Sequence, residues 1–355
     1  MSTARISLDS DPENALVDEL RAACAWVAAR SATVRVLPER IVPYAQTLTG
    51  DLAPAAAPAP ATPAQRETEA AFWLTLDAIN FGSGWFPTLR KREQPTGYRT
   101  IAAGVKRRFA QAGRWSPAEL CELSATELAG WLDQDPEHEL IALMLGSLHD
   151  LGQNVRRLYG GSFAAVVDGA RGSAVALVQT LAAWRCFADF SRYDGRLLPF
   201  LKRAQIAAAD LHRAGVADFS DLDRLTMFAD NLVAHVLRLD GVLWFDPELV
   251  ARIECGELIE HGSAEEVEIR ACAVHAVELL VAAAPSGRRR RRSIRSSGTA
   301  DRRRSTRRLR DIAAARAPTD QRAALARSLT IALTAAGLSK SSGRSVPLAA
   351  MSTAG

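Results

Sequence analysis

The residues DLDRLTMFADNLVAHVLRLD, at positions 221–240, carry the clearest helical pattern in this chain. Apolar side chains recur there at steps of three and four, the spacing that lines up one face of an α-helix. The members of this stripe are Leu222, Leu225, Ala229, Leu232, Val236 and Leu239. The pattern predicts a single helix over 221–240, in which Asp230 lies one residue past Ala229 of the apolar stripe.

The same periodicity covers most of the chain before residue 285. It predicts further helices over residues 13–30, 65–79, 100–112, 117–132, 137–158, 173–190, 200–214, 247–255 and 264–284. Aromatic residues make up only 6% of the chain, and alanine, leucine and valine supply most of the apolar side chains, which favours helix over strand. No alternation of strands and helices and no clear hairpin is visible. We therefore expect an all-α fold.

Three regions differ in composition. Residues 1–64 combine an N-terminal helical region with the segment DLAPAAAPAPATPA (51–64), a linker in which each interior proline would cost a helix about 3 kcal/mol. Residues 65–285 form the expected helical core. Residues 286–355 are an Arg-rich tail without apolar period, and we expect this tail to be disordered because it cannot bury a core.

The charge is divided between the same regions. The chain has a formal net charge of +4, but residues 286–310 alone hold twelve arginines against one aspartate. Residues 311–355 add five basic against two acidic groups, so residues 1–285 must carry a net charge of about −10. Nucleic acid is expected as a partner only through the basic tail, in weak and nonspecific electrostatic contact.

Several sequence features concern the compartment. No apolar run approaches the roughly 18 residues of a membrane span, and the polar, acidic N-terminus is unlike a signal peptide. The five cysteines are widely spaced, without a CxxC pair or zinc-ligand spacing. We expect a cytoplasmic protein with free thiols, no membrane contact and no metal site.

A first candidate segment is AFWLTLDAINFGSGWFPTLRKR, at 71–92. The helix predicted there stops near Asn80 and Phe81, and glycines and aromatic residues follow. Glycines let the backbone approach a ligand closely, and aromatic rings can stack on a planar base. The alternative is a helix end with ordinary aromatic packing.

A second candidate segment is LLPFLKRAQIAAADLH, at 197–212. Its predicted helix buries a stripe formed by Leu201, Ala204, Ala208 and Leu211. Lys202 and Gln205 lie three residues apart on an adjoining face, where both could reach one anionic group. The alternative is a solvated lysine.

Asp230, in the third segment, is a carboxylate at the edge of an apolar stripe. Burial disfavours its charged form, so such a position requires a partner or a use. A carboxylate there could stabilise a developing positive charge. The alternative is a structural aspartate with a partner.

Taken together, the segments resemble the queuosine 5'-phosphate N-glycosylase/hydrolase family, the queuosine salvage proteins. The stretches that carry the resemblance are TLDAINFGSGWFP, GGSF (160–163), PFLKRAQIAAADL, LTMFAD and SAEEVEIRA (263–271). They span roughly residues 70–284, and the combination of FxKRAQ, LTMFAD and EEVEIRA is the specific part.

The resemblance implies an all-α fold similar to that of helical DNA glycosylases. It also implies hydrolysis of the N-glycosidic bond of queuosine 5'-phosphate, which releases queuine for salvage into tRNA modification, with no metal or redox cofactor. The aspartate of the family's FAD motif is catalytic, which here is Asp230.

The remaining site residues expected on this basis bind the small-molecule nucleotide. Phe228 packs against the base and Lys202 is the candidate for the 5'-phosphate. The other expected substrate-binding residues are Asn231, Asp77, Asn80 and Phe81.

Two departures from the family pattern affect the functional interpretation. Asn231 stands where the family usually has tyrosine, and nothing after Pro285 matches the family's acidic D-x-x-L-W segment. Three interpretations therefore remain open: a working nucleotide hydrolase with a divergent base pocket, a family fold with lost or altered activity, and a nucleic-acid-binding protein that acts through its basic tail.

Overall fold

A computed structural model describes residues 15–47, 62–91 and 96–283. The predicted tail and most of the predicted Ala/Pro linker lie outside these residues. The first half of the described chain contains the elements α1 (Ala15–Ala28), β1 (Val34–Val36), α2 (Pro38–Thr47), α3 (Pro63–Ala78), the 3-10 helix η1 (Ser83–Thr88), α4 (Gly97–Ala112), α5 (Pro117–Glu122), α6 (Ala125–Leu132) and α7 (Glu139–Tyr159).

The second half contains α8 (Phe163–Gly169), α9 (Ala174–Ala182), β2 (Phe190–Tyr193), β3 (Arg196–Pro199), α10 (Lys202–Arg213), the 3-10 helix η2 (Leu222–Arg224), α11 (Asn231–Leu239), β4 (Leu243–Phe245), α12 (Pro247–Glu254) and α13 (Ala264–Ala283). The strands are short and form two antiparallel pairs, β1 with β4 and β2 with β3. The expected all-α class is confirmed. In the described part, no helix is long and apolar enough to cross a membrane.

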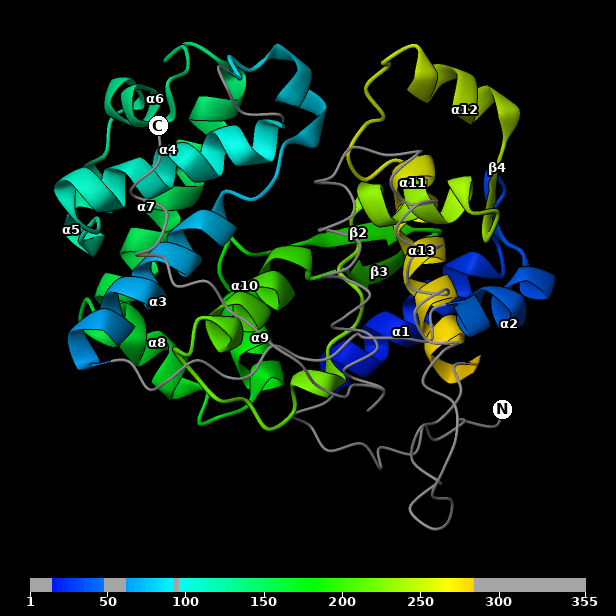
Figure 1. The fold of residues 1–355 in the computed structure, drawn as a ribbon, viewed down its shortest axis with the longest axis horizontal. Coiled ribbons are helices and arrows are strands. Elements are labelled where there is room, and N and C mark those ends of the chain that lie inside the picture. Colours follow the sequence, from blue (N-terminus) through cyan, green and yellow to red (C-terminus); the bar gives the residue numbers. More distant parts are fainter. Residues whose placement is uncertain (1–14, 48–61, 92–95, 284–355) are drawn as a thin grey trace, which may run out of the picture.

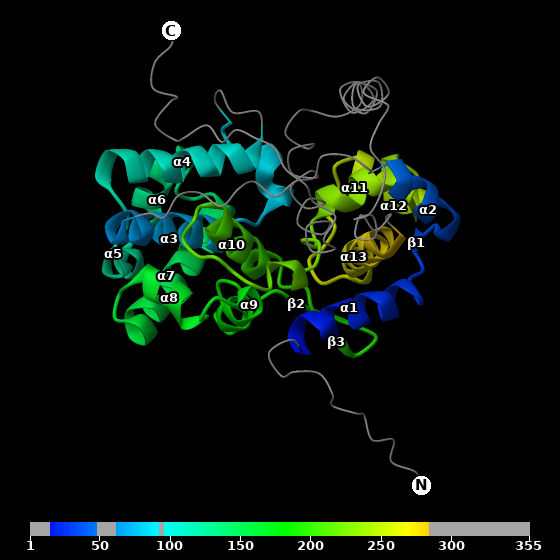
Figure 2. The same cartoon turned by 60° about the horizontal axis from the view of Figure 1, so that its bottom comes forward.

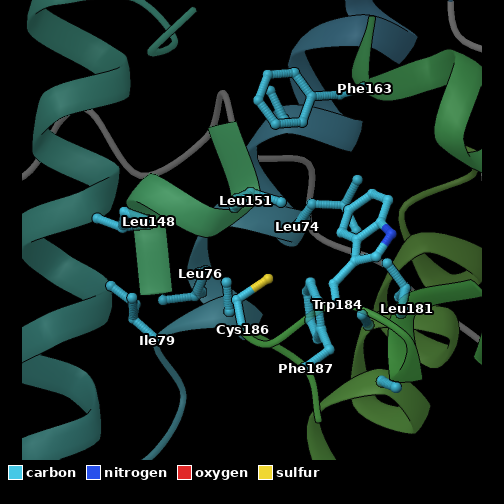
Figure 3. Packing of buried hydrophobic residues seen from close by; sticks show 14 of the residues in the cluster. Leu74, Leu76, Ile79, Leu148, Leu151, Phe163, Leu181, Trp184, Cys186 and Phe187 are labelled. Atoms are coloured by element: carbon cyan, nitrogen blue, oxygen red, sulfur yellow. The ribbon is translucent and has the colours of Figure 1, made fainter. Parts of the chain in front are cut away.

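The helices form two groups, each around its own apolar core (Figure 1). The first core is built by α3 to α10, and Figure 3 shows part of it, where Leu74 and Leu76 lie with Leu148, Leu151, Trp184 and Phe187. The second core is built by α1, α2, α11, α12 and α13 together with the strands. The two groups remain separate when the molecule is turned (Figure 2), with α9 and α10 next to the boundary.

The chain passes between the two cores at a few defined points. Phe200 belongs to the second core, and the next residue, Leu201, belongs to the first. Leu225 lies in the first core and Met227 in the second. We call this boundary the seam. Lys202 follows the first of these two crossings directly, and Asp230 lies three residues after Met227.

Several helix boundaries follow from local sequence signals. Thr62 caps α3 in a reciprocal capping box with Gln65, and Pro63 occupies the first helical turn. The predicted break at Gly160 is confirmed, because this residue adopts the left-handed conformation that ends α7. The predicted helix 117–132 is two helices, and Ser124 caps the second of them.

The predicted helix over 221–240 is wrong in its first half. Only a 3-10 turn at 222–224 and the helix α11 at 231–239 form, and the residues between them are not helical. All five residues from Leu225 to Ala229 are buried, so this stretch has no helical stripe. The Gln205 side chain and Arg270 bind its backbone instead, at Thr226 N and Ala229 O.

The predicted helix 173–190 is also wrong in its second half, and the absence of a hairpin is corrected. α9 ends at Ala182, and β2 and β3 pair as a hairpin with Tyr193 opposite Arg196. The turn residues Asp194 and Gly195 both have positive φ, at 46° and 77°. Asp-Gly is a typical sequence for such a two-residue turn.

Candidate functional site

Asp230 is the N-cap of α11, and does not lie on the face of a longer helix. Its Oδ1 accepts a hydrogen bond from the Leu232 N–H at 2.9 Å. The Asp230 side chain remains 35% exposed. Placement at a helix N-terminus orients the carboxylate and adds the favourable end of the helix dipole.

Lys202, the first residue of α10, reaches the same carboxylate. Its Nζ lies 2.6 Å from Asp230 Oδ2, and its side chain is 19% exposed. Burial opposes ionisation of Asp230, but the Lys202 charge and the hydrogen bonds from Lys202 and Leu232 hold its pKa below the usual value. Asp230 is therefore a carboxylate at neutral pH, with an exposed edge.

Gln205 does not lie on a polar face with Lys202, and that prediction is wrong. The predicted stripe of α10 is confirmed as fully buried, and Gln205 is fully buried as well. Its amide accepts the Thr226 N–H at 2.8 Å and donates to the Phe200 carbonyl at 3.2 Å. The Gln205 side chain of α10 therefore binds the backbone at the two seam crossings described above, at Phe200 and at Thr226.

Arg203 connects the end of α3 to this site. It donates to the Ala78 carbonyl at 3.0 Å and to the Ala188 carbonyl at 3.3 Å. Its guanidinium lies 4.8 Å from the centre of the Phe81 ring. The segment that carries Asn80 and Phe81 is thus attached to the first turn of α10, next to Lys202.

Asp77, in the last turn of α3, is fully buried. Neither of its oxygens makes a hydrogen bond of standard geometry with another described residue. Burial raises the pKa of Asp77 well above its usual value and the charge of Asp210 raises it further, while Asn80, Arg213 and Lys202 act in the opposite direction. A neutral carboxyl group here could both donate and accept a hydrogen bond.

The other predicted substrate-binding residues flank the Lys202–Asp230 pair in the chain or in space. Phe228 is 6% exposed, and its carbonyl accepts the Asp230 N–H at 2.6 Å. Asn231, the first residue of α11, is exposed, and Asn80 and Phe81 are half-buried. The three predicted segments thus converge on one region of the seam.

A hollow of about 540 Å³ lies elsewhere, beside the GGSF segment. Its lining includes Arg66, Glu67, Arg114 and Ser162, but none of the predicted site residues. The Glu67 carboxylate accepts the N–H groups of Phe163 and Ala164 and so caps α8. This contact gives the GGSF motif a structural explanation.

The motifs so far described are also those of a known family. The family model described as "Queuosine salvage protein" matches residues 60–298, two thirds of the chain. The chain belongs to the queuosine salvage protein family.

Curated queuosine salvage proteins named "Queuosine 5'-phosphate N-glycosylase/hydrolase" are similar to this chain. The protein of Sphaerobacter thermophilus is 35% identical over 224 residues, 61% of this chain and 69% of the relative. That of Schizosaccharomyces pombe is 34% identical over 223 residues, 59% of this chain and 64% of the relative. That of Bos taurus is 34% identical over 153 residues, so the match spans less than half of the cattle protein, 45% of its length.

Sequence reasoning missed three charged residues around the site of this queuosine salvage protein: Asp189, Arg203 and Arg270. Two of them lie inside quoted motifs, Arg203 in KRAQ and Arg270 in EEVEIRA. The signal was present, because an arginine inside a specific motif suggests a defined partner. Asp189 carried no comparable signal.

Proposed function

We propose that this chain hydrolyses the N-glycosidic bond of queuosine 5'-phosphate, and that Asp230 is the catalytic carboxylate. Two facts support the proposal: the chain belongs to the queuosine salvage family, and its relatives carry the name of this activity. The observation that carries the assignment to Asp230 is geometric: its carboxylate is 35% exposed and lies 2.6 Å from the Lys202 ammonium, whose charge lowers the pKa of Asp230.

The chemistry requires a fixed negative charge near the sugar. As the bond between the base and the ribose anomeric carbon breaks, positive charge develops on the ribose. Asp230 stabilises that charge or captures the sugar covalently, and water then completes the hydrolysis. The electron pair of the broken bond leaves with the base, which gains a proton. The products are queuine and ribose 5-phosphate.

The substrate-binding assignments form part of the same proposal. Phe228 packs against the base, and Asn231, Asn80 and Phe81 contribute further contacts. Asp77 offers a buried carboxyl group whose oxygens make no hydrogen bond of standard geometry within the described residues. Lys202 binds the 5'-phosphate, so a single cation serves both Asp230 and the substrate, and the phosphate supplies remote binding energy that orients the sugar.

We further propose that the reaction takes place in the cytoplasm. All five cysteines are free. Free thiols suit a reducing compartment.

The test of this function is a product assay. Purified protein is incubated with queuosine 5'-phosphate, and queuine and ribose 5-phosphate are quantified by mass spectrometry. The proposal predicts equimolar release of both. Unchanged substrate after long incubation would contradict it and favour a family fold with lost or altered activity.

A further inference from the structure

One buried ion pair lies behind the Lys202–Asp230 contact. Asp189 immediately precedes β2, and Arg270 lies in α13. Arg270 Nη2 is 2.8 Å from Asp189 Oδ1 and 2.6 Å from Oδ2. The two side chains are only 6% and 8% exposed. Displacing either side chain of such a pair would leave the other charge buried without a partner, so the pair holds both side chains in place.

Asp189 holds the backbone from which Lys202 projects. Its Oδ2 accepts the Lys202 N–H at 2.9 Å, and its carbonyl accepts the Leu201 N–H at 3.2 Å. Leu201 is fully buried and has a φ of +54°. A non-glycine residue in this conformation costs on the order of 1–3 kcal/mol unless its surroundings impose it. Asp189 supports this conformation through the two hydrogen bonds, together with the burial of the Leu201 side chain.

Arg270 holds the backbone from which Asp230 projects. Its Nε donates to the Ala229 carbonyl at 3.0 Å, in the peptide group directly before Asp230. Its Nη1 donates to Glu266 at 3.1 Å, and its guanidinium lies 4.0 Å from the centre of the Phe200 ring. Together these contacts fix the orientation of the Arg270 guanidinium.

We propose that Asp189 and Arg270 are positioning residues that set the distance between Lys202 and Asp230. The ion pair joins two crossings of the seam, the one between Phe200 and Leu201 and the one between Leu225 and Met227. Without it, each crossing could shift with its own core. The proposal rests on the proposed function for its effect on catalysis, but not for its effect on the free protein.

Two variants separate position from charge. Arg270→Lys retains the positive charge near Asp230 but loses the planar fork that reaches Ala229, Asp189 and Glu266 at once. Asp189→Asn has nearly the same shape and removes one negative charge. By charge alone this second change would lower the pKa of Asp230, so a rise would report altered geometry.

Arg21→Lys is the matched control. Arg21 of α1 donates to the Arg224 carbonyl at 2.6 Å, at the other end of the same non-helical segment. It also pairs with Asp18 and Glu278 at 3.1 Å. Arg21 therefore has the same kinds of partner as Arg270, a backbone carbonyl and two carboxylates. The carbonyl that it contacts, at Arg224, is farther along the chain from Asp230 than Ala229 is.

The experiment measures two quantities for each variant. Steady-state hydrolysis of queuosine 5'-phosphate gives kcat and KM, and carbon-13 NMR of labelled aspartate gives the pKa of Asp230 without substrate. We expect Arg270→Lys and Asp189→Asn to lower kcat on the order of 10²-fold, the effect of a misplacement of about 1 Å, with little change in KM. The pKa of Asp230 should rise in both, and Arg21→Lys should change neither quantity.

Other results would overturn the proposal. An unchanged pKa of Asp230 in both variants would do so, as would an equal change in Arg21→Lys. Failure of both variants to fold, with Arg21→Lys folded, would limit the ion pair to a structural role. If the wild-type protein released no queuine, the proposed function would fail, and the NMR titration would still decide the positioning.

Discussion

Two carboxylates in this molecule, Glu268 and Asp230, both have a lowered pKa but differ in exposure and in the number of hydrogen bonds that they accept. Glu268 is 2% exposed and lies in the second core. It accepts five hydrogen bonds, from the N–H groups of Ala32 (3.1 Å), Thr33 (2.7 Å) and Val34 (3.2 Å) and from the hydroxyls of Thr33 (2.7 Å) and Tyr193 (2.7 Å). Among the described residues, the Asp230 carboxylate contacts only the Lys202 ammonium and the Leu232 N–H, and it stays 35% exposed.

The difference separates a structural acid from an acid available for chemistry. An ionised carboxylate has about four acceptor positions, and Glu268 has used them on the chain itself. Asp230 has used two and presents the rest outward. The two motifs therefore contribute differently: EEVEIRA supplies Glu268 to the second core and Arg270 to the seam, while LTMFAD presents Asp230 at the seam.

The largest effect on stability is expected at Glu268. Glu268→Ala would leave several buried donors without an acceptor, so the free energy of unfolding should fall by about 3–5 kcal/mol. The folded fraction should keep its kcat, as measured by urea unfolding and turnover in parallel. Glu260→Ala, an exposed acid in the same part of the chain, is the control. A stable Glu268→Ala protein with low kcat would remove the distinction between the two carboxylates.

A smaller effect is expected at Lys202. Asp230 works as a carboxylate, so activity is present above its pKa and is lost as pH falls through it. Lys202→Met removes the charge that lowers this pKa, so the acid-side loss of kcat should move to higher pH. At neutral pH the rate should fall about 10- to 100-fold, the size of one charge-assisted hydrogen bond.

Comparing the nucleotide with the nucleoside as substrate then defines the role of Lys202. If Lys202→Met lowers the hydrolysis rate only with queuosine 5'-phosphate, Lys202 binds the phosphate. If the rate falls equally with the nucleoside queuosine, Lys202 acts on Asp230 alone. Lys106→Met, on an exposed position of α4, is the matched control and should leave the pH profile unchanged.

The smallest effect is expected at Asp77. Unlike Glu268, its oxygens accept no well-formed hydrogen bonds from the described residues, and unlike Asp230, it is fully buried. Because folding raises its pKa, the stability it contributes is present at low pH and is lost as pH rises toward and through the folded value. Asp77→Asn should therefore be more stable than the wild type at pH 8, by about 1–3 kcal/mol, with no gain in strong acid. Affinity for the nucleotide should fall.

Thermal unfolding at the two pH values and nucleotide titration check this. Asp223→Asn, an exposed control, should change neither. Equal stability of Asp77→Asn and wild type at pH 8 would contradict the expected cost of the buried carboxyl group.

Local signals predicted much of the fold. The spacing of Leu201, Ala204, Ala208 and Leu211 predicted the buried face of α10, and two glycines predicted the end of α7. The β2–β3 hairpin was also within reach, since Asp194-Gly195 is a local turn signal. These features depend on residues within a few positions of one another.

The site depended on contacts that no local pattern contains. The segment before Asp230 has helical spacing but does not form a helix, because Gln205 and Arg270 bind its backbone from distant parts of the chain. The Lys202–Asp230 contact likewise joins residues 28 positions apart. The resemblance pointed to both residues as site candidates, but their contact is visible only in the fold.

The most direct test of the central claim compares wild type with Asp230→Asn in the release of queuine from queuosine 5'-phosphate. Asparagine caps a helix as well as aspartate, so α11 and the thermal stability should be retained. The account predicts that the variant releases queuine slower on the order of 10³-fold, because it lacks the negative charge that stabilises the sugar cation. A variant that turns over at a rate comparable to the wild type would contradict the account.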